Sequence, residues 1–326
     1  MRISRERILK EAAATGFRPE VFEKVAQLLS LLQGIWKHSF LKNRMVLKGG
    51  TALNLFILDV PRLSVDIDLN YIGSPDRETM HTERPDMDSA ITAVCQREGF
   101  MLRKSPTEHA GGKWLLRYES AFGPGANLTI DVNFMFRIPL WPVALSKSHH
   151  VGSYMAENIP ILDINEIAAG KLCALLSRHT ARDLFDAHQL LTRNILDRKR
   201  LRLAFIVYGA MNRKDWRNTS EQDISYDTNE LMNELIPVLR TGEIKGGGDR
   251  WQWASRMVEE CRNAISIVLP FTEGEREFLD RILDHGEVVP SLITDDEDTA
   301  DRIGKHPGLQ WKALNVKEFK GKGSNT

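Results

Sequence analysis

The sequence predicts an α/β (α+β) amino-terminal part followed by a mostly helical carboxy-terminal part, in a bilobed chain. Alternation of apolar and polar residues, which is typical of strands, is largely confined to the first 160 of the 326 residues. Helical spacing of apolar residues dominates after that, and the length suits two domains of roughly 150 residues each. We therefore expect one domain over residues 1–160 and a helical domain over residues 161–326.

The expected amino-terminal elements follow from local patterns taken in chain order. Apolar residues recur at helical spacing over residues 4–38, with a break near Gly16–Pro19. A short apolar strand at Met45–Leu47 runs into Lys48-Gly49-Gly50, and a helix over Thr51–Leu58 follows, capped by Thr51 or Gly50. The later patterns predict strands over 64–71, 101–104, 113–118 and 128–134, a polar loop over 73–85 and a helix over 88–98.

The carboxy-terminal half shows a succession of helical patterns and few strand signals. Helices are predicted over residues 165–177, 181–193, 196–211, 226–239, 251–268 and 273–285. Between them, Gly246–Gly248 is expected to form a loop or hinge. The acidic run Asp295–Asp298 is expected to be solvated.

Composition and the absence of common motifs exclude several protein classes. The 44 basic and 44 acidic residues give zero net charge, which excludes a polycationic nucleic-acid binder but not a local basic cleft. The three cysteines, Cys95, Cys173 and Cys261, form neither a disulfide framework nor a CxxC zinc pair. No Walker A, GxSxG or HExxH sequence is present. Because the chain shows no signal peptide and no apolar run of ~20 residues, we expect a reduced, cytoplasmic protein that does not contact membranes.

The segment SVDID carries a pair of carboxylates. In a strand, Asp66 and Asp68 project from one face together with Ser64. Two such close carboxylates repel each other, and a divalent cation relieves the repulsion. Upstream, Gly49 and Gly50 lead into a helix whose first amides are suited to bind an anion. Taken alone, the aspartate pair is equally typical of a solvated strand face, and the Gly49-Gly50 pair is equally typical of a tight turn. Together they predict a metal site beside a phosphate site, which nucleotidyl transfer needs.

Asp131 is the candidate for a third carboxylate. It stands alone among apolar residues in the predicted strand 128–134, where a buried, unpaired carboxylate would be costly. If this strand lies beside that of Asp66 and Asp68, Asp131 would share a metal with them and act as general base toward an acceptor hydroxyl. The alternative is a solvent-facing residue on a half-exposed strand.

Four segments in this order together resemble the nucleotidyltransferase toxins of the AbiEii/AbiGii type, a group that includes the mycobacterial MenT toxins. The segments are GGTALNL, RLSVDIDL, the IDV strand and EIAAGKLCALLSRHTARDLFD, and the resemblance covers about residues 40–190. It implies a DNA polymerase β-like nucleotidyltransferase fold. It also implies Gly49, Gly50 and Ser64 at the phosphate site, and Asp66 and Asp68 as magnesium ligands.

The resemblance extends to residues outside the glycine and aspartate motifs. The serine that corresponds to Ser64 is phosphorylated in some relatives, which makes it a candidate control point here. We expect Lys48 and Thr51, which flank the two glycines, to join the nucleotide site.

The EIAAGKLCALLSRHTARDLFD segment adds basic residues and a further aspartate. Lys171 lies in an apolar helical stripe and either reaches water or aims its ammonium at the triphosphate; the resemblance favours the second. In similar proteins the aspartate of the RD pair, here Asp183, belongs to the active site alongside the lysine. Arg178 and Arg182 are candidate phosphate ligands, or else surface arginines four residues apart.

The implied activity is that of a toxin that transfers NMP from an NTP, with Mg²⁺ or Mn²⁺, to the 3′ acceptor end of tRNA and so blocks translation. The resemblance also implies a role in phage defence and a cognate antitoxin, such as an AbiEi-like winged-helix protein. Zero net charge does not support RNA binding, so tRNA rests on the resemblance alone. The alternatives are nucleotidylation of a protein side chain or of a small molecule such as an antibiotic, and a non-enzymatic module with an inert acidic cluster.

Overall fold

The structure, a computed structural model, describes residues 2–104, 111–244 and 249–323. Contacts between residues divide the chain into two units. Unit 1 comprises Met1–Arg137, Val143–Leu162 and Leu235–Gly247, and unit 2 comprises Ile138–Pro142, Asp163–Glu234 and Gly248–Thr326. Each unit is thus built from separate stretches of chain, and a domain boundary after residue 160 stays a prediction. The predicted hinge at Gly246–Gly248 lies outside the described residues.

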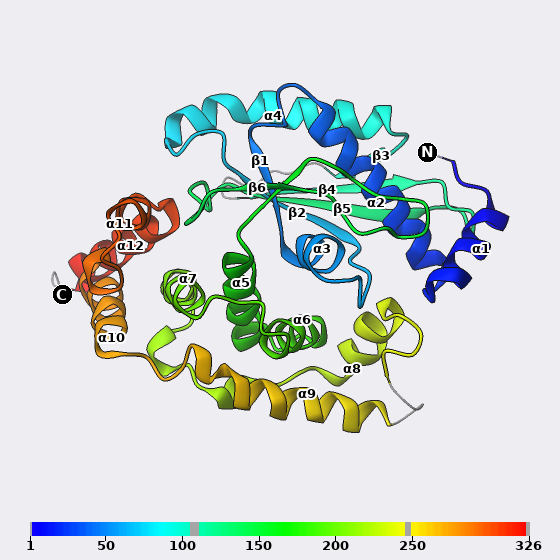
Figure 1. Cartoon of the computed structure of the whole chain (residues 1–326). Helices are drawn as coiled ribbons and strands as arrows, with labels where there is room; N and C mark the ends of the chain where they lie inside the picture. The colour runs from blue at the N-terminus through cyan, green and yellow to red at the C-terminus, as the bar shows by residue number, and fades with distance from the viewer. Residues whose placement is uncertain (1, 105–110, 245–248, 324–326) are drawn as a thin grey trace. The chain divides into compact units, whose positions relative to one another are not determined.

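A seven-stranded sheet lies at the centre of unit 1 (Figure 1). Its spatial order is β3-β4-β5-β2-β1-β7-β6. Strand β2 runs parallel to β5 and β1 parallel to β7, whereas the other neighbours are antiparallel. The strands are β1 Met45–Lys48, β2 Asp66–Tyr71, β3 Met101–Lys104, β4 Gly111–Tyr118, β5 Ala126–Asn133, β6 Ala144–Ser146 and β7 Ile159–Ile161. The predicted mixed α/β class is confirmed; β6 and β7, of three residues each, are too short to show alternation.

Helices cover both faces of this sheet. In Figure 1, α2 and α4 lie on one side of the sheet and α3 on the other. The helices of unit 1 are α1 Arg5–Thr15, α2 Pro19–Lys37, α3 Gly49–Ala52 and α4 Arg77–Arg97. The predicted break between the first two is confirmed, because Gly16 ends α1 with a positive φ of 76° and Pro19 begins α2.

Two local predictions in unit 1 are wrong. The helix predicted from Thr51 begins at Gly49 and continues as a π-helical turn over Leu53–Ile57, so its N-cap is Lys48 rather than Thr51 or Gly50. The predicted polar loop over 73–85 is mostly helix, because the Asp76 carboxylate caps α4 by accepting from the Thr79 amide at 2.7 Å.

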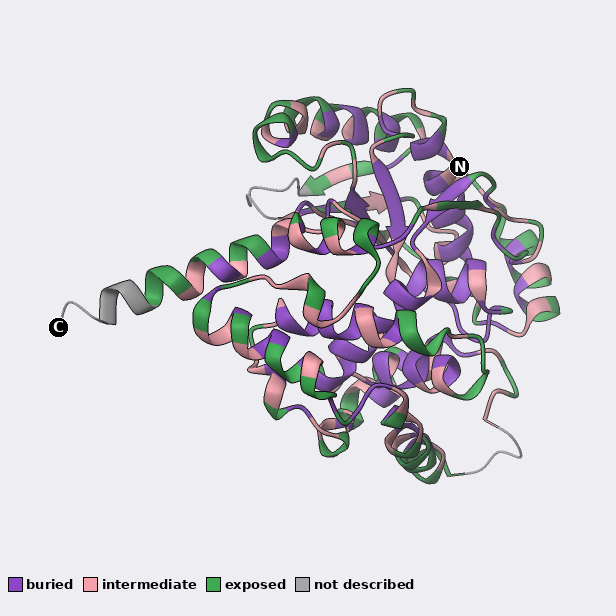
Figure 2. Cartoon of the chain, turned by 60° about the vertical axis from the view of Figure 1, so that its left-hand side comes forward, coloured by how far each residue is buried: buried purple, intermediate pink, exposed green. Residues whose placement is uncertain are grey.

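Among the described residues of unit 2, the regular elements are helices joined by turns and irregular segments. Helices α5 and α7 pack together, as do α6 and α9 (Figure 1). In Figure 2 buried residues are frequent in the strands and helices of each unit, and residues 317–319 of α12 are exposed. The helices are α5 Ile164–Arg178, α6 Ala181–Thr192, α7 Arg198–Ala210, α8 Thr228–Glu230, α9 Arg250–Ala264, α10 Glu273–Asp280, α11 Glu297–Gly304 and α12 Pro307–Gly323.

Three further sequence predictions concern the helix over 226–239, the cysteines and membrane-spanning segments. The continuous helix predicted over 226–239 is instead a sequence of α, π and 3-10 turns that ends near Pro237. All three cysteines are buried and free. Among the described residues, none of the helices combines the length and apolar character that a membrane crossing requires.

Candidate active site

Three aspartates lie on one face of the sheet in unit 1. On β2, Asp66 and Asp68 alternate with the buried Ile67. The parallel strand β5 lies beside β2, with Asp131 as the register partner of Asp68 and Thr129 as that of Asp66. Register partners on neighbouring strands project to the same face. The structure therefore places Asp131 beside the acidic pair, with all three aspartates partly buried.

Magnesium suits this donor set. Mg²⁺ prefers carboxylate oxygens, and it is commonly held by one or two protein carboxylates while waters and substrate phosphates complete its shell. No group of three His, Cys, Asp or Glu side chains within residues 2–104, 111–244 and 249–323 forms a complete metal cage. The paired carboxylates of Asp66 and Asp68 therefore fit an ion that arrives with a nucleotide, and direct ligation by Asp131 stays a prediction.

Two lysines flank Asp68 and Asp131 along one row of the sheet. Lys48 on β1 is the register partner of Asp68, and Lys113 on β4 is the partner of Asp131. The row across four strands is thus Lys48, Asp68, Asp131 and Lys113, with the two carboxylates between two ammonium groups. Sequence reasoning missed Lys113. Its signal is the pairing of the two alternating segments that flank the Gly-Pro-Gly turn at 123–125.

Gly49 allows the start of α3 to lie directly against the acidic pair. Its φ is +70°, and a Cβ at this position would overlap the carboxylate of Asp68. Any L-residue here would therefore combine an unfavourable backbone conformation with a steric clash. The close approach of Gly49 to Asp68 thus requires glycine, and binding of a phosphate by its amide stays a prediction.

Gly50 brings α3 against the segment that precedes β2. A Cβ at Gly50 would lie 2.9 Å from Ser64 Oγ and 3.0 Å from Arg62 Nη2. Both side chains are buried, with exposed fractions of 7% for Ser64 and 3% for Arg62. Ser64 lies before the first residue of β2, so it is outside the strand that was expected to contain it. Arg62 is a second missed residue, and its signal is a lone cation directly before the apolar-acidic alternation.

Thr51 holds the helix and the strand in register. Its hydroxyl donates to the backbone oxygen of Asp66 at 2.5 Å, and its side chain is fully buried. One turn later, the Asn54 amide donates to the backbone oxygen of Gly50 at 3.0 Å. Thr51 therefore positions the acidic pair relative to the glycine turn.

A second cluster of charged side chains lies inside unit 2. The Lys171 ammonium on α5 lies 3.0 Å from Asp183 Oδ1 and 2.8 Å from Asp186 Oδ2, both on α6. The exposed side-chain fractions are 13% for Lys171, 6% for Asp183 and 0% for Asp186. The lysine thus neither reaches freely into water nor stands alone in an apolar stripe. Asp186 completes the cluster and was not among the candidates from sequence.

Asp183 is the centre of this cluster. Its Oδ2 accepts from Arg178 at 3.1 Å and from the Thr180 hydroxyl at 2.8 Å. Burial raises the pKa of this carboxyl, but Lys171, Arg178 and the Thr180 hydrogen bond outweigh burial, so the pKa lies below its ordinary value. Asp183 therefore remains a carboxylate at neutral pH and keeps the Lys171 ammonium in place.

The two arginines of this segment diverge. Arg178 is the last residue of α5, and His179 then takes a left-handed conformation with φ 57° before α6 begins. Arg178 is 64% exposed and pairs with Asp183, whereas Arg182 lies 3.7 Å from Glu234. The two arginines lie on separate helices, one on each side of this turn, and whether they are phosphate ligands or surface arginines is not decided by these contacts. Phosphate binding by either stays a prediction.

Comparison with known proteins identifies the family of the chain. The family model for the nucleotidyl transferase AbiEii toxin of type IV toxin–antitoxin systems matches residues 30–257. The chain belongs to this AbiEii family. It is therefore a nucleotidyltransferase and a toxin of a type IV system, which implies an NTP as substrate and a cognate antitoxin.

Structural comparison agrees with this AbiEii assignment at the level of the fold. The nucleotidyltransferase toxin MenT4 from Mycobacterium tuberculosis is 15% identical to the chain, with a TM-score of 0.56. The match covers 95% of this chain and 99% of that one. A search of curated proteins gives no match.

Proposed function

We propose that this AbiEii toxin transfers NMP from an NTP to the 3′ acceptor end of tRNA, using Mg²⁺, and so blocks translation. The register of β2 and β5 is the observation that carries the proposal, because it puts Asp131 beside Asp68 on the face that Asp66 shares. A general base next to two metal-binding carboxylates is the arrangement that activates a hydroxyl for attack on phosphorus. The choice of tRNA rests on the family resemblance.

In the proposed reaction the terminal hydroxyl oxygen of the acceptor forms a bond to the α-phosphorus of the NTP. The α–β phosphoanhydride bond breaks and pyrophosphate leaves with the bonding electrons. Asp131 takes the proton of the attacking hydroxyl. Asp66 and Asp68 would hold Mg²⁺, which when bound neutralises phosphate charge and lowers the pKa of the hydroxyl.

The remaining residues bind and orient the triphosphate. The Gly49 and Gly50 amides approach it closely, and Lys48 and Ser64 border the same turn. We assign Lys171 to the charge that develops on the leaving phosphates, with Asp183 as its positioning residue. Arg178 and Arg182 are assigned to phosphate binding in the same reaction. The cytoplasm supplies both substrates, and we place the enzyme there.

The test incubates purified protein with total tRNA, Mg²⁺ and each α-labelled NTP in turn. We expect label at the tRNA 3′ end, loss of that label with EDTA, and its return with Mg²⁺ or Mn²⁺. Asp66→Asn and Asp68→Asn should each lower labelling at least 100-fold, since each removes a carboxylate that would hold the Mg²⁺. Asp86→Asn, a change of an exposed carboxylate on α4, is the matched control and should label normally.

Two results would overturn the proposal. Label on a protein or small molecule instead of tRNA would move the acceptor to a different class while the enzyme chemistry stands. Labelling that is indifferent to both Asp66→Asn and Asp68→Asn would remove the acidic pair from the reaction. For the partner, co-expression with the product of an adjacent open reading frame should relieve toxicity if that product is the antitoxin.

A further inference from the structure

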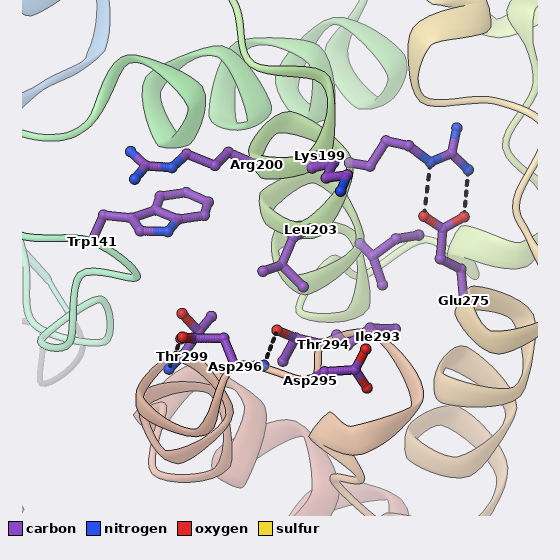
Figure 3. A pocket seen from close by; sticks show the side chains of 12 residues that line it. Trp141, Lys199, Arg200, Leu203, Glu275, Ile293, Thr294, Asp295, Asp296 and Thr299 are labelled. Atoms are coloured by element: carbon purple, nitrogen blue, oxygen red, sulfur yellow. Dashed lines mark hydrogen bonds and ion pairs between the residues drawn. The ribbon is translucent and has the colours of Figure 1, made fainter.

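Unit 2 contains a cavity of about 560 Å³ that none of the proposed catalytic residues lines (Figure 3). Helix α7 supplies Lys199, Arg200 and Leu203 on one side, and the segment before α11 supplies Asp295 and Asp296 on the other. Trp141 forms the third side. The volume lies within the range of small-molecule sites and accommodates one nucleotide.

The aromatic wall of this cavity is held rigidly. The Trp141 backbone amide donates to Glu166 Oε2 at 3.3 Å, and the Tyr208 hydroxyl donates to Glu166 Oε1 at 2.8 Å. The guanidinium of Arg200 lies 5.3 Å from the centroid of the indole ring. Trp141 is therefore fixed between α5 and α7 before any ligand binds, which lowers the entropic cost of binding.

The charges on the cavity wall divide into paired and available groups. Arg202 forms a bidentate ion pair with Glu275, in which Nε donates to Oε1 at 3.0 Å and Nη2 donates to Oε2 at 2.5 Å. Arg200 pairs with Asp163 at 3.0 Å. The backbone amide of Lys199 bonds to the Asp197 carboxyl, which also interacts electrostatically with the Lys199 charge. In the described part of the chain, the Lys199 ammonium and the Asp295 carboxylate make no ion pair and no side-chain hydrogen bond, and both residues are exposed. An available cation thus lies on one side and an available carboxylate on the other.

The Asp295 side of the cavity is also ordered by hydrogen bonds. Asp296 accepts from the Thr299 amide at 2.8 Å as the N-cap of α11, and its own amide donates to the Thr294 hydroxyl at 3.2 Å. Figure 3 shows both interactions on the side of the cavity opposite α7. These bonds hold the acidic segment in place, so its acceptors are presented in a fixed direction.

We propose that this cavity binds one unpaired nucleotide of an RNA acceptor, with a base that carries an exocyclic amino group. The flat base packs against Trp141 and Leu203, its amino group donates to Asp295, and Lys199 binds the neighbouring phosphate. Carboxylates accept from the amino groups of adenine, guanine and cytosine. Uracil has no amino group, and a carboxylate that approaches its N3–H also approaches the two carbonyl oxygens beside it, which repel the negative charge. This inference rests on the proposed function for its choice of RNA.

The test measures binding rather than catalysis. Full-length protein with Asp66→Asn is titrated into labelled single-stranded RNAs of eight cytidines or eight uridines, and separately with CMP and UMP. We expect the cytidine oligomer to bind about tenfold more tightly than the uridine oligomer. Binding of CMP alone as tightly as the oligomer would identify a free nucleotide as the ligand and overturn the assignment to RNA.

Variants separate the cavity from general electrostatics. Asp295→Asn removes a negative charge, so simple charge attraction predicts tighter binding of both oligomers, whereas our proposal predicts that the preference for cytidine is lost. Arg198 is the exposed neighbour of Lys199 on α7 and does not line the cavity, so Arg198→Glu is the matched control. Lys199→Glu should weaken binding about tenfold more than this control. Equal effects of the two reversals, or tighter binding with an unchanged base preference in Asp295→Asn, would overturn the proposal.

The binding test and the labelling assay can fail separately. Selective RNA binding without transfer to tRNA would retain the nucleotide site and reject the proposed acceptor. Transfer to tRNA with no change of KM for tRNA in Lys199→Glu would retain the enzyme and reject the site.

Discussion

Asp68 and Asp131 are register partners on the parallel strands β2 and β5, and Gly49 lies so close that a Cβ there would overlap the Asp68 carboxylate. Two chain segments more than 60 residues apart in sequence thus meet at one carboxylate row. Strands β2 and β5 need not be consecutive for this, because β5 enters the sheet next to β2 after the hairpin with β4.

Gly49→Ala should abolish labelling and cost about 2 kcal/mol of stability, because it adds a left-handed alanine and a clash with Asp68. Gly123→Ala is the matched control, since a Cβ there meets nothing within 4 Å. Urea unfolding and the labelling assay together check both. Normal activity in Gly49→Ala would show that the helix start does not need its close approach to Asp68.

Lys171→Met should destabilise the protein by about 3 kcal/mol, because it leaves the buried carboxylates of Asp183 and Asp186 without their shared cation. Arg178→Ala, which removes an exposed partner of the same Asp183, should cost less than about 1 kcal/mol. Urea titration of the two variants measures the difference. Equal costs would show that the buried and the exposed cations contribute alike.

Glu166 should make stability fall as pH rises from about 4.5 to 7. Burial raises the pKa of its carboxyl to about 7, against 4.5 in the unfolded chain. Within this window the folded protein holds a proton that the unfolded chain has lost, so stability drops by up to about 3 kcal/mol and then levels off. Glu166→Gln should remove that slope. Urea unfolding at several pH values checks it, and parallel curves for both proteins would contradict it.

Ser64→Glu should reduce labelling far more than Ser64→Ala. The serine is buried beside Gly50, so a carboxylate there adds negative charge next to the turn expected to bind phosphate. We expect Ser64→Ala to stay within about tenfold of the native rate, since it removes one neutral hydroxyl. NTP affinity, measured with each variant after circular dichroism confirms folding, separates lost binding from lost structure. Similar NTP affinities in the two variants would argue against control at this position.

Sequence patterns predicted the elements that carry a periodic signal. The alternation in β2 and β5 is strong because Ile67 and Ile130 must be buried on one face while the aspartates point to the other. The break before Pro19 has its own stereochemical signal. By contrast, Pro85 suggested a loop, but the cap at Asp76 and burial of Met80 and Met87 extend α4 through it.

The site residues that sequence reasoning missed depend on tertiary register. Lys113 meets Asp131 only because β4 and β5 pair with this particular offset. Arg62 comes close to Gly50 only because α3 folds back over the segment before β2. Asp186 joins Lys171 through the packing of α5 on α6. None of these distances follows from spacing along the chain, because each depends on where a second element docks.

The segment Leu235–Gly247 has a consequence for how the protein is made. It returns to unit 1 after much of unit 2 has been synthesised, and the Leu63 amide donates to Val238 O at 2.8 Å while the Arg240 amide donates to Pro61 O at 3.3 Å. A nascent chain that ends at Leu162 has no partner for the strand segment beside Ser64. At ~5–20 residues per second, roughly 80 further residues take several seconds to emerge. The corner beside Ser64 therefore stays open until about 240 of the 326 residues have been synthesised, so an amino-terminal fragment alone cannot complete it.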